Sequence, residues 1–130
     1  MRVFKVRAFA RFQRKERIAD AALVRAVRDI EAGLIDADLG QGLIKQRVAR
    51  AGQGKSRGFR TIIAVRKQDR AVFLLGYAKS DKADLDPDEH AELARRGEVW
   101  LKAQWRVIET AIAEERLAEI ELDDEGEAEG

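Results

Sequence analysis

Hydrophobic and polar residues alternate at the start of the chain. In residues 3–9, Phe4 and Val6 are separated by Lys5 and followed by Arg7. Because successive side chains of a strand point to opposite faces, this period of two predicts a half-buried strand.

The hydrophobic spacing then lengthens to that of helices. Residues 10–17 are rich in Arg, Lys and Gln and predict a short basic helix. A second helix is predicted to begin at Asp20, a residue type that caps helix N-termini, and to end at Gly33, which suits the left-handed position after a helix. Its apolar residues recur every three or four positions: Leu23, Val27, Ile30 and Leu34.

Three apolar segments in the middle of the chain predict strands. They span residues 43–48, 59–65 and 71–77, and a polar turn at residues 36–42 precedes the first. The link at residues 66–70 is short and charged, which is typical of a hairpin, so the last two strands are expected to be antiparallel neighbours.

A strong helix start follows the strands. Asp86 can cap the helix, Pro87 suits its first position, and Glu89 stands three residues after the cap. Helical spacing continues in the apolar residues Leu93, Trp100, Leu101, Trp105, Ile108, Ile112 and Leu117. We therefore expect one long helix that packs on the sheet, with a bend or break at Gly97; a groove for a partner is the alternative use of this stripe.

These elements predict an α+β fold in the order β-α-α-β-β-β-α, with a sheet of about four strands. A length of 130 residues suits one domain. We assign residues 1–120 to that domain. Residues 121–130 are mostly acidic and have little to bury, so they predict a disordered tail.

The composition narrows the possible chemistry. The chain has no cysteine and one histidine, His90, which excludes a disulfide framework, a thiol nucleophile and the two-histidine metal motifs. We expect neither a metal nor another cofactor, and we place His90 at the surface. No apolar run approaches the ~18 residues of a spanning helix, and the basic N-terminus does not resemble a signal peptide, so we expect a cytoplasmic protein without a membrane partner.

Charge is distributed unevenly along the chain. Residues 1–79 contain 19 Lys and Arg against 7 Asp and Glu, whereas residues 80–130 contain 6 against 17. The net charge of +1 therefore hides a strongly basic body and an acidic remainder. Such asymmetry indicates a polyanionic partner for the body.

The basic residues are densest in the predicted strands. No acidic residue lies between Leu39 and Gln68, where eight basic residues occur: Lys45, Arg47, Arg50, Lys55, Arg57, Arg60, Arg66 and Lys67. Lys45 and Arg47 are two apart on one strand and share a face. If the strands are adjacent, Arg60 and Lys79 can join them in a phosphate-binding groove. The alternative is a solvated strand face with no function.

A glycine-containing segment adjoins these cations. Gly52, Gly54 and Gly58 are predicted to allow close approach of the backbone to a ligand. The Gly-Lys-Ser at residues 54–56 does not complete a nucleotide-binding loop, because Ala49 stands where the pattern requires glycine and because the segment joins two strands.

Four motifs together resemble the RelE/HigB branch of the RelE/ParE toxin superfamily over about residues 1–115. They are Leu-Gly-x-Gly at residues 39–42, Lys-x-Arg at 45–47, Gly-Lys-Ser-x-Gly-Phe-Arg at 54–60 and Ala-Lys-Ser at 78–80. The resemblance implies a curved antiparallel sheet, with two helices after the first strand and one at the C-terminal end. It also implies a type II toxin that cleaves messenger RNA on the ribosome, inhibits translation and is blocked by a cognate antitoxin, without a metal.

The resemblance assigns four catalytic residues. Lys45 is the candidate base that activates the 2′-hydroxyl, and its like-charged neighbours make loss of its proton easier. Arg47 and Arg60 are expected to hold the scissile phosphate and stabilise its transition state. Lys79 is expected to assist the leaving 5′-oxygen.

Four further residues are expected to bind RNA: Arg50, Lys55, Arg57 and Tyr77. Tyr77 suits stacking on a base, although a core position is the alternative. The sequence also departs from better-known RelE enzymes. Ser80 and Asp86 stand where those enzymes carry an arginine and a catalytic tyrosine, and close relatives have glycine in place of Arg57.

Two other functions remain open from the residues. A ParE-like toxin has the same fold and inhibits DNA gyrase without cutting RNA. A catalytically silent module that binds nucleic acid through the same basic face is the other alternative.

Overall fold

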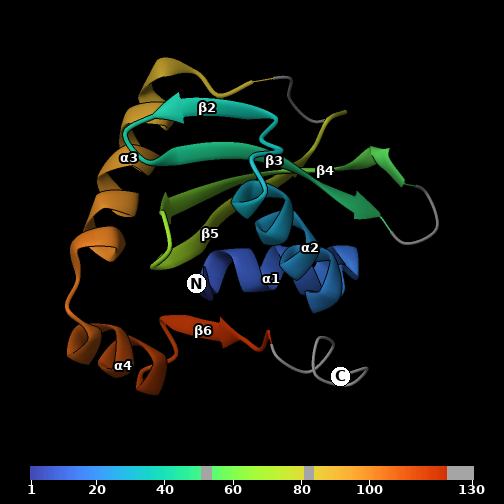
Figure 1. Ribbon diagram of the computed structural model, residues 1–130. Coiled ribbons are helices and arrows are strands. Elements are labelled where there is room, and N and C mark those ends of the chain that lie inside the picture. Colours follow the sequence, from blue (N-terminus) through green and yellow to red (C-terminus); the bar gives the residue numbers. More distant parts are fainter. Residues whose placement is uncertain (51–53, 81–83, 123–130) are drawn as a thin grey trace.

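A computed structural model describes residues 1–50, 54–80 and 84–122 (Figure 1). The α+β class is confirmed, and two helices follow the first strand. The elements are β1 (Arg2–Val6), α1 (Arg7–Glu16), α2 (Asp20–Glu31), β2 (Ala37–Gly40), β3 (Leu43–Arg50), β4 (Gly54–Arg66), β5 (Arg70–Ala78), α3 (Pro87–Lys102), α4 (Trp105–Ala113) and β6 (Leu117–Ile120).

The sheet has six strands in the order β2-β3-β4-β5-β1-β6. β1 runs parallel to β5, and the other four neighbouring pairs are antiparallel, as predicted. The sheet is therefore mixed rather than wholly antiparallel, and it has two more strands than expected. Two strands of four residues each, β2 and β6, were missed. β2 lies within the predicted polar turn, and β6 contains Leu117, which had been assigned to a helix.

The first strand is shorter than predicted. β1 ends at Val6, and α1 begins at Arg7 rather than at residue 10. Phe9, predicted as the last residue of the strand, lies in α1 with 1% of its surface exposed. Its ring packs on Phe73 of β5 at a centroid distance of 5.1 Å. In the helix, residue 9 thus faces the sheet.

The second helix has the predicted end but a different cap. Gly33 has φ +85°, and the amide of Leu34 donates to Asp29 O at 2.8 Å, which forms a Schellman motif. Leu34 therefore lies outside the helical stripe and is exposed. The N-cap is Ala19, not Asp20.

Asp20 instead connects three elements. Its carboxylate accepts hydrogen bonds from Gln13 Nε2 at 2.7 Å and from Lys5 Nζ at 3.2 Å. Partial burial alone raises the pKa of Asp20, but the hydrogen bond from Gln13 and the charge of Lys5 outweigh it and lower this pKa overall. The bonds join β1, α1 and the start of α2.

The three central strands are confirmed and are longer than predicted. Arg66 pairs with Arg70 across the β4–β5 hairpin, as the short link indicated. β3 and β4 together take up most of the segment assigned to a glycine loop, apart from residues 51–53, which the structure does not describe. A Cβ on Gly58 would lie 1.9 Å from Val48 O, so the close approach at Gly58 is to β3 and not to a ligand.

The C-terminal helix begins as predicted but is divided in two. Asp86 and Glu89 form the capping box at its start. The chain leaves the helical conformation at Ala103 rather than at Gly97, and α4 begins two residues later. A Cβ on Gly97 would lie 3.1 Å from the Cβ of Ala64, so this glycine brings α3 close to β4.

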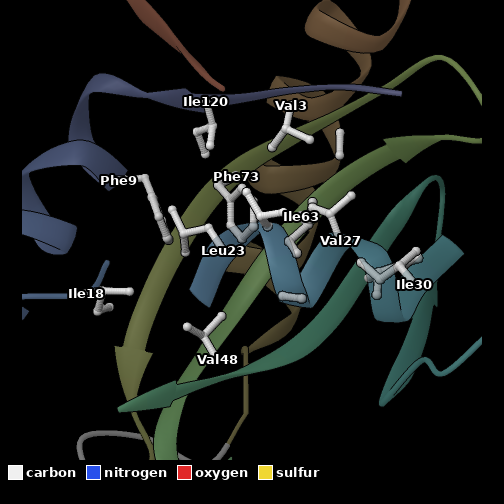
Figure 2. Packing of buried hydrophobic residues seen from close by; sticks show 14 of the residues in the cluster. Val3, Phe9, Ile18, Leu23, Val27, Ile30, Val48, Ile63, Phe73 and Ile120 are labelled. Atoms are coloured by element: carbon white, nitrogen blue, oxygen red, sulfur yellow. The ribbon is translucent and has the colours of Figure 1, made fainter. Parts of the chain in front are cut away.

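A hydrophobic core covers each face of the sheet. On one face, α1 and α2 pack against side chains from several strands; Figure 2 shows Leu23 and Val27 of α2 close to Ile63 and Phe73. On the other face, α3 and α4 contribute Leu93 and Ile108. Helices therefore cover both faces of the sheet. This explains why β1 and β5 carry apolar side chains on both of their faces.

Two sequence expectations concern the outside of the domain. Residues 123–130 of the predicted acidic tail lie outside the described residues. Within residues 1–50, 54–80 and 84–122, no helix is both long and apolar enough to cross a membrane.

Candidate nucleic-acid site

Three of the predicted catalytic residues lie on one face of adjacent strands. Arg47 of β3 pairs with Arg60 of β4, which in turn pairs with Tyr77 of β5. Directly opposed residues of neighbouring strands point to the same face, so the side chains of Arg47, Arg60 and Tyr77 form a row across the sheet. Lys45 stands two residues before Arg47 and shares that face.

The opposite face of β3 is occupied by the core, as the alternation predicted. Gln46 is 1% exposed, and its amide donates to Leu34 O at 2.8 Å and accepts from the Asp36 backbone amide at 3.0 Å. These bonds satisfy a buried polar group and tie β3 to the segment that precedes β2. They prevent β3 from slipping by one residue, which would reverse the faces of Lys45 and Arg47.

The guanidinium of Arg60 is partly buried. The Nη1 atom of Arg60 is buried and has no hydrogen-bond partner among the described residues. Leaving a charged donor buried without an acceptor costs on the order of 1–3 kcal/mol or more. A bound anion with free oxygen atoms would relieve this cost.

Two acidic residues lie against the other cations. The carboxylate of Asp84 is 2.8 Å from Lys45 Nζ, and the hydrogen bond from Lys45 lowers the pKa of Asp84. The carboxylate of Asp36 accepts from the backbone amide of Arg47 at 2.6 Å and lies 4.0 Å from its Nε. Lys45 therefore already holds an anionic oxygen, whereas Arg47 is held mainly through its backbone.

Lys79 follows β5 directly, two residues after Tyr77. Its side chain is exposed and has no ion pair or hydrogen bond within the described part of the chain. Because Ala78 pairs with Phe59, Lys79 lies at the end of the sheet where Arg60 is found. The structure thus brings Lys79 to the same sheet end as Arg60 but leaves its side chain unanchored.

The predicted RNA-binding residues are less well defined. The side chains of Arg50, Lys55 and Arg57 lie outside those that the structure describes. Tyr77 is 6% exposed and packs in the core beneath α3, which was the alternative to stacking on a base. Asp86, which stands in place of a family tyrosine, serves as the helix cap.

Sequence reasoning missed two partners of the site and misjudged one residue. Asp36 and Asp84 are 11 and 39 residues distant from their partners, and no local pattern connects them. His90, expected at the surface, is half-buried, and its Nε2 lies 3.2 Å from Leu39 O. That contact joins α3 to β2, a strand that the sequence analysis did not predict.

Comparison with known families agrees with the fold. A family model described as the RelE toxin of the RelE/RelB toxin-antitoxin system matches residues 1–120. No curated protein matches the chain. The matched region contains every described helix and strand. The chain therefore belongs to the RelE toxin family of toxin-antitoxin systems.

Proposed function

We propose that this toxin is a metal-independent endoribonuclease that cleaves messenger RNA on the ribosome and thereby inhibits translation. The observation that carries the proposal is the row of Arg47 and Arg60 on paired strands, with Lys45 on the same face. The buried Nη1 of Arg60 lacks an acceptor within the described residues, and a phosphate oxygen can supply one. Family membership supports the same conclusion.

The chemistry uses the 2′-hydroxyl of the RNA as the nucleophile. Its oxygen forms a bond to the adjacent phosphorus, and the bond from phosphorus to the 5′-oxygen breaks. One proton leaves the 2′-hydroxyl and one reaches the 5′-oxygen, so the products carry a 2′,3′-cyclic phosphate and a 5′-hydroxyl. Cationic side chains stabilise the charge that accumulates on the phosphorane, and no metal is required.

Each cation has a proposed role in this reaction. Arg47 and Arg60 bind the two non-bridging oxygens, a task that suits the guanidinium fork. Lys45 lies beside them. After the substrate displaces Asp84, the Lys45 ammonium releases a proton to solvent, and the resulting neutral amine accepts the proton of the 2′-hydroxyl. Lys79, exposed at the same end of the sheet, donates the proton that the leaving 5′-oxygen takes up.

The test is a reconstituted translation reaction with one reporter messenger. New 5′ ends are mapped with the parent protein, with Lys45→Ala and with Arg60→Met. We expect at least a 100-fold loss of cleavage in each variant, within the range for loss of an acid–base or charge-stabilising group. Arg66→Met is the matched control, because it removes an exposed charge from the far end of the same strand and should leave cleavage unchanged.

Other outcomes would overturn the proposal. Growth arrest with altered plasmid supercoiling and no new 5′ ends would indicate the gyrase-inhibiting alternative. Salt-dependent RNA binding without arrest or cleavage would indicate a silent module. Thermal unfolding of each variant shows whether a loss of activity reflects a loss of fold.

A further inference from the structure

A second basic surface lies between α1, α3 and the turn before β6, and it shares no residue with the candidate RNA site. It is a cleft of about 450 Å³. Four arginines line it: Arg7, Arg11, Arg96 and Arg116. Its other lining is apolar and includes Leu93, Val99 and Trp100 of α3.

The lining of the cleft includes an apolar side chain that is exposed to solvent. Val99 is 62% exposed, although most of the other large aliphatic side chains of the described chain are buried. Leu93 is 8% exposed and continues from the cleft into the core between α3 and the sheet. Arg116 lies over the ring of Trp100 at 5.9 Å, which places a cation beside the aromatic surface. Exposed apolar side chains that are bordered by charges are typical of protein-binding surfaces.

The cleft keeps an excess of positive charge after its internal contacts are considered. Two of the arginines are paired with carboxylates, in the pairs Arg96–Glu92 and Arg116–Glu114. Among the described residues, the guanidinium of Arg7 donates only to backbone carbonyls, at 3.0 and 3.2 Å. Arg11 has no ion pair or hydrogen bond among the residues that the structure describes. Arg7 and Arg11 can therefore attract an anionic partner.

We propose that this cleft binds an amphipathic segment of the cognate antitoxin, in which aliphatic side chains are flanked by carboxylates. Membership of the toxin-antitoxin family implies such a partner, and the proposal does not depend on ribonuclease activity. The aliphatic residues of the segment fill the apolar lining beside Val99, and its carboxylates bind Arg7 and Arg11. An RNA strand would also be attracted to the arginines, but it has no aliphatic groups to cover Val99.

The experiment measures the dissociation constant between the full-length toxin and its purified cognate antitoxin. Val99→Asp puts a negative charge into the apolar lining, and Arg11→Glu reverses the charge of the unpaired arginine. We expect each to weaken antitoxin binding at least tenfold. The affinity of the parent should fall with added salt, and Arg11→Glu should reduce that dependence.

Matched controls lie on α4, outside the cleft. Val107→Asp and Arg106→Glu make the same chemical changes at exposed positions and should leave the dissociation constant unchanged. The proposal is overturned if the cleft variants bind antitoxin as tightly as the parent does. It is also overturned if they lose RNA binding with unchanged antitoxin affinity, since the cleft would then be an RNA contact. Antitoxin binding is measured without RNA, so a failure of the ribonuclease proposal leaves this test intact.

Discussion

Replacement of the buried Arg70 by methionine should loosen the junction between α3 and α4. Arg70 is 2% exposed, and its Nη1 donates to Trp100 O and Ala103 O, both at 2.8 Å. Its guanidinium lies 4.0 Å from the ring centroid of Trp105. Asp69 provides the nearby negative charge, at 3.3 Å from Nε. One side chain of β5 thus holds both the end of α3 and the start of α4.

The magnitude follows from the contacts that methionine cannot make. Each hydrogen bond from a charged donor contributes about 1.5–3 kcal/mol, and a cation over a desolvated aromatic ring contributes about 1–2 kcal/mol. Methionine recovers part of this through apolar burial, and it removes the cost of keeping a charge in the core. We therefore expect Arg70→Met to lower the free energy of unfolding by about 3 kcal/mol and the melting temperature by about 10 °C.

Urea unfolding of the parent and of two variants tests this reasoning. Arg66→Met is the control: Arg66 also donates to a helix carbonyl, Leu101 O at 2.7 Å, but its side chain is 54% exposed. Because solvent replaces exposed contacts, Arg66→Met should cost less than about 1 kcal/mol. The reasoning is refuted if Arg70→Met costs no more than Arg66→Met does. A folded variant that has lost only the order of α4 would show a reduced urea dependence as well.

Three further predictions concern the site and the fold. Asp84→Asn removes the negative charge beside Lys45 and should increase the affinity for a labelled RNA oligonucleotide several-fold at low salt. Fluorescence anisotropy measures this affinity. Unchanged or weaker binding would contradict the idea that Asp84 masks the charge of Lys45. Asp20 has a lowered pKa in the folded state, so its stabilising contribution is present above the usual carboxyl pKa and lost as the pH falls through the lower, folded-state value. Asp20→Asn should therefore be less stable than the parent in urea at pH 7, and the difference should shrink below about pH 4; a difference that does not depend on pH would contradict this. Gly58→Ala forces a Cβ into the backbone of β3 and should cost at least about 2 kcal/mol in thermal unfolding. Gly97→Ala, in contrast, meets only side chains, the nearest at 3.1 Å, and gains helix propensity. Equal losses in the two glycine variants would show that the contact at Gly58 is not the controlling one.

Local patterns predicted the parts of the fold whose partners are close in sequence. The capping box of Asp86 and Glu89 and the glycine at position 33 marked helix ends, because those signals lie within one helical turn. The β4–β5 hairpin was predictable for the same reason. Alternation along β3 also placed Lys45 and Arg47 on the face opposite Gln46.

The remaining features depend on contacts between distant segments. Helical spacing continues from Leu93 to Leu117, across the break at Ala103. At that break, Arg70 donates to the carbonyls of Trp100 and Ala103, and Arg66 donates to that of Leu101. β6 is a strand because it pairs with β1, not because its four residues favour that structure. The ion pair between Asp84 and Lys45 likewise arises from the tertiary fold. Sequence pattern could therefore indicate which cations meet at the candidate site but not which carboxylates accompany them.

The position of β1 has a consequence for the synthesis of the toxin. β1 precedes every other element in the order of the chain, yet it lies between β5 and β6, whose residues are made much later. Before residues 117–120 are made, β1 is an apolar strand with one unpaired edge, which favours association with other strands. Formation of the complete sheet, and of any activity that requires it, is thus delayed until residues 117–120 have been translated and can pair with β1.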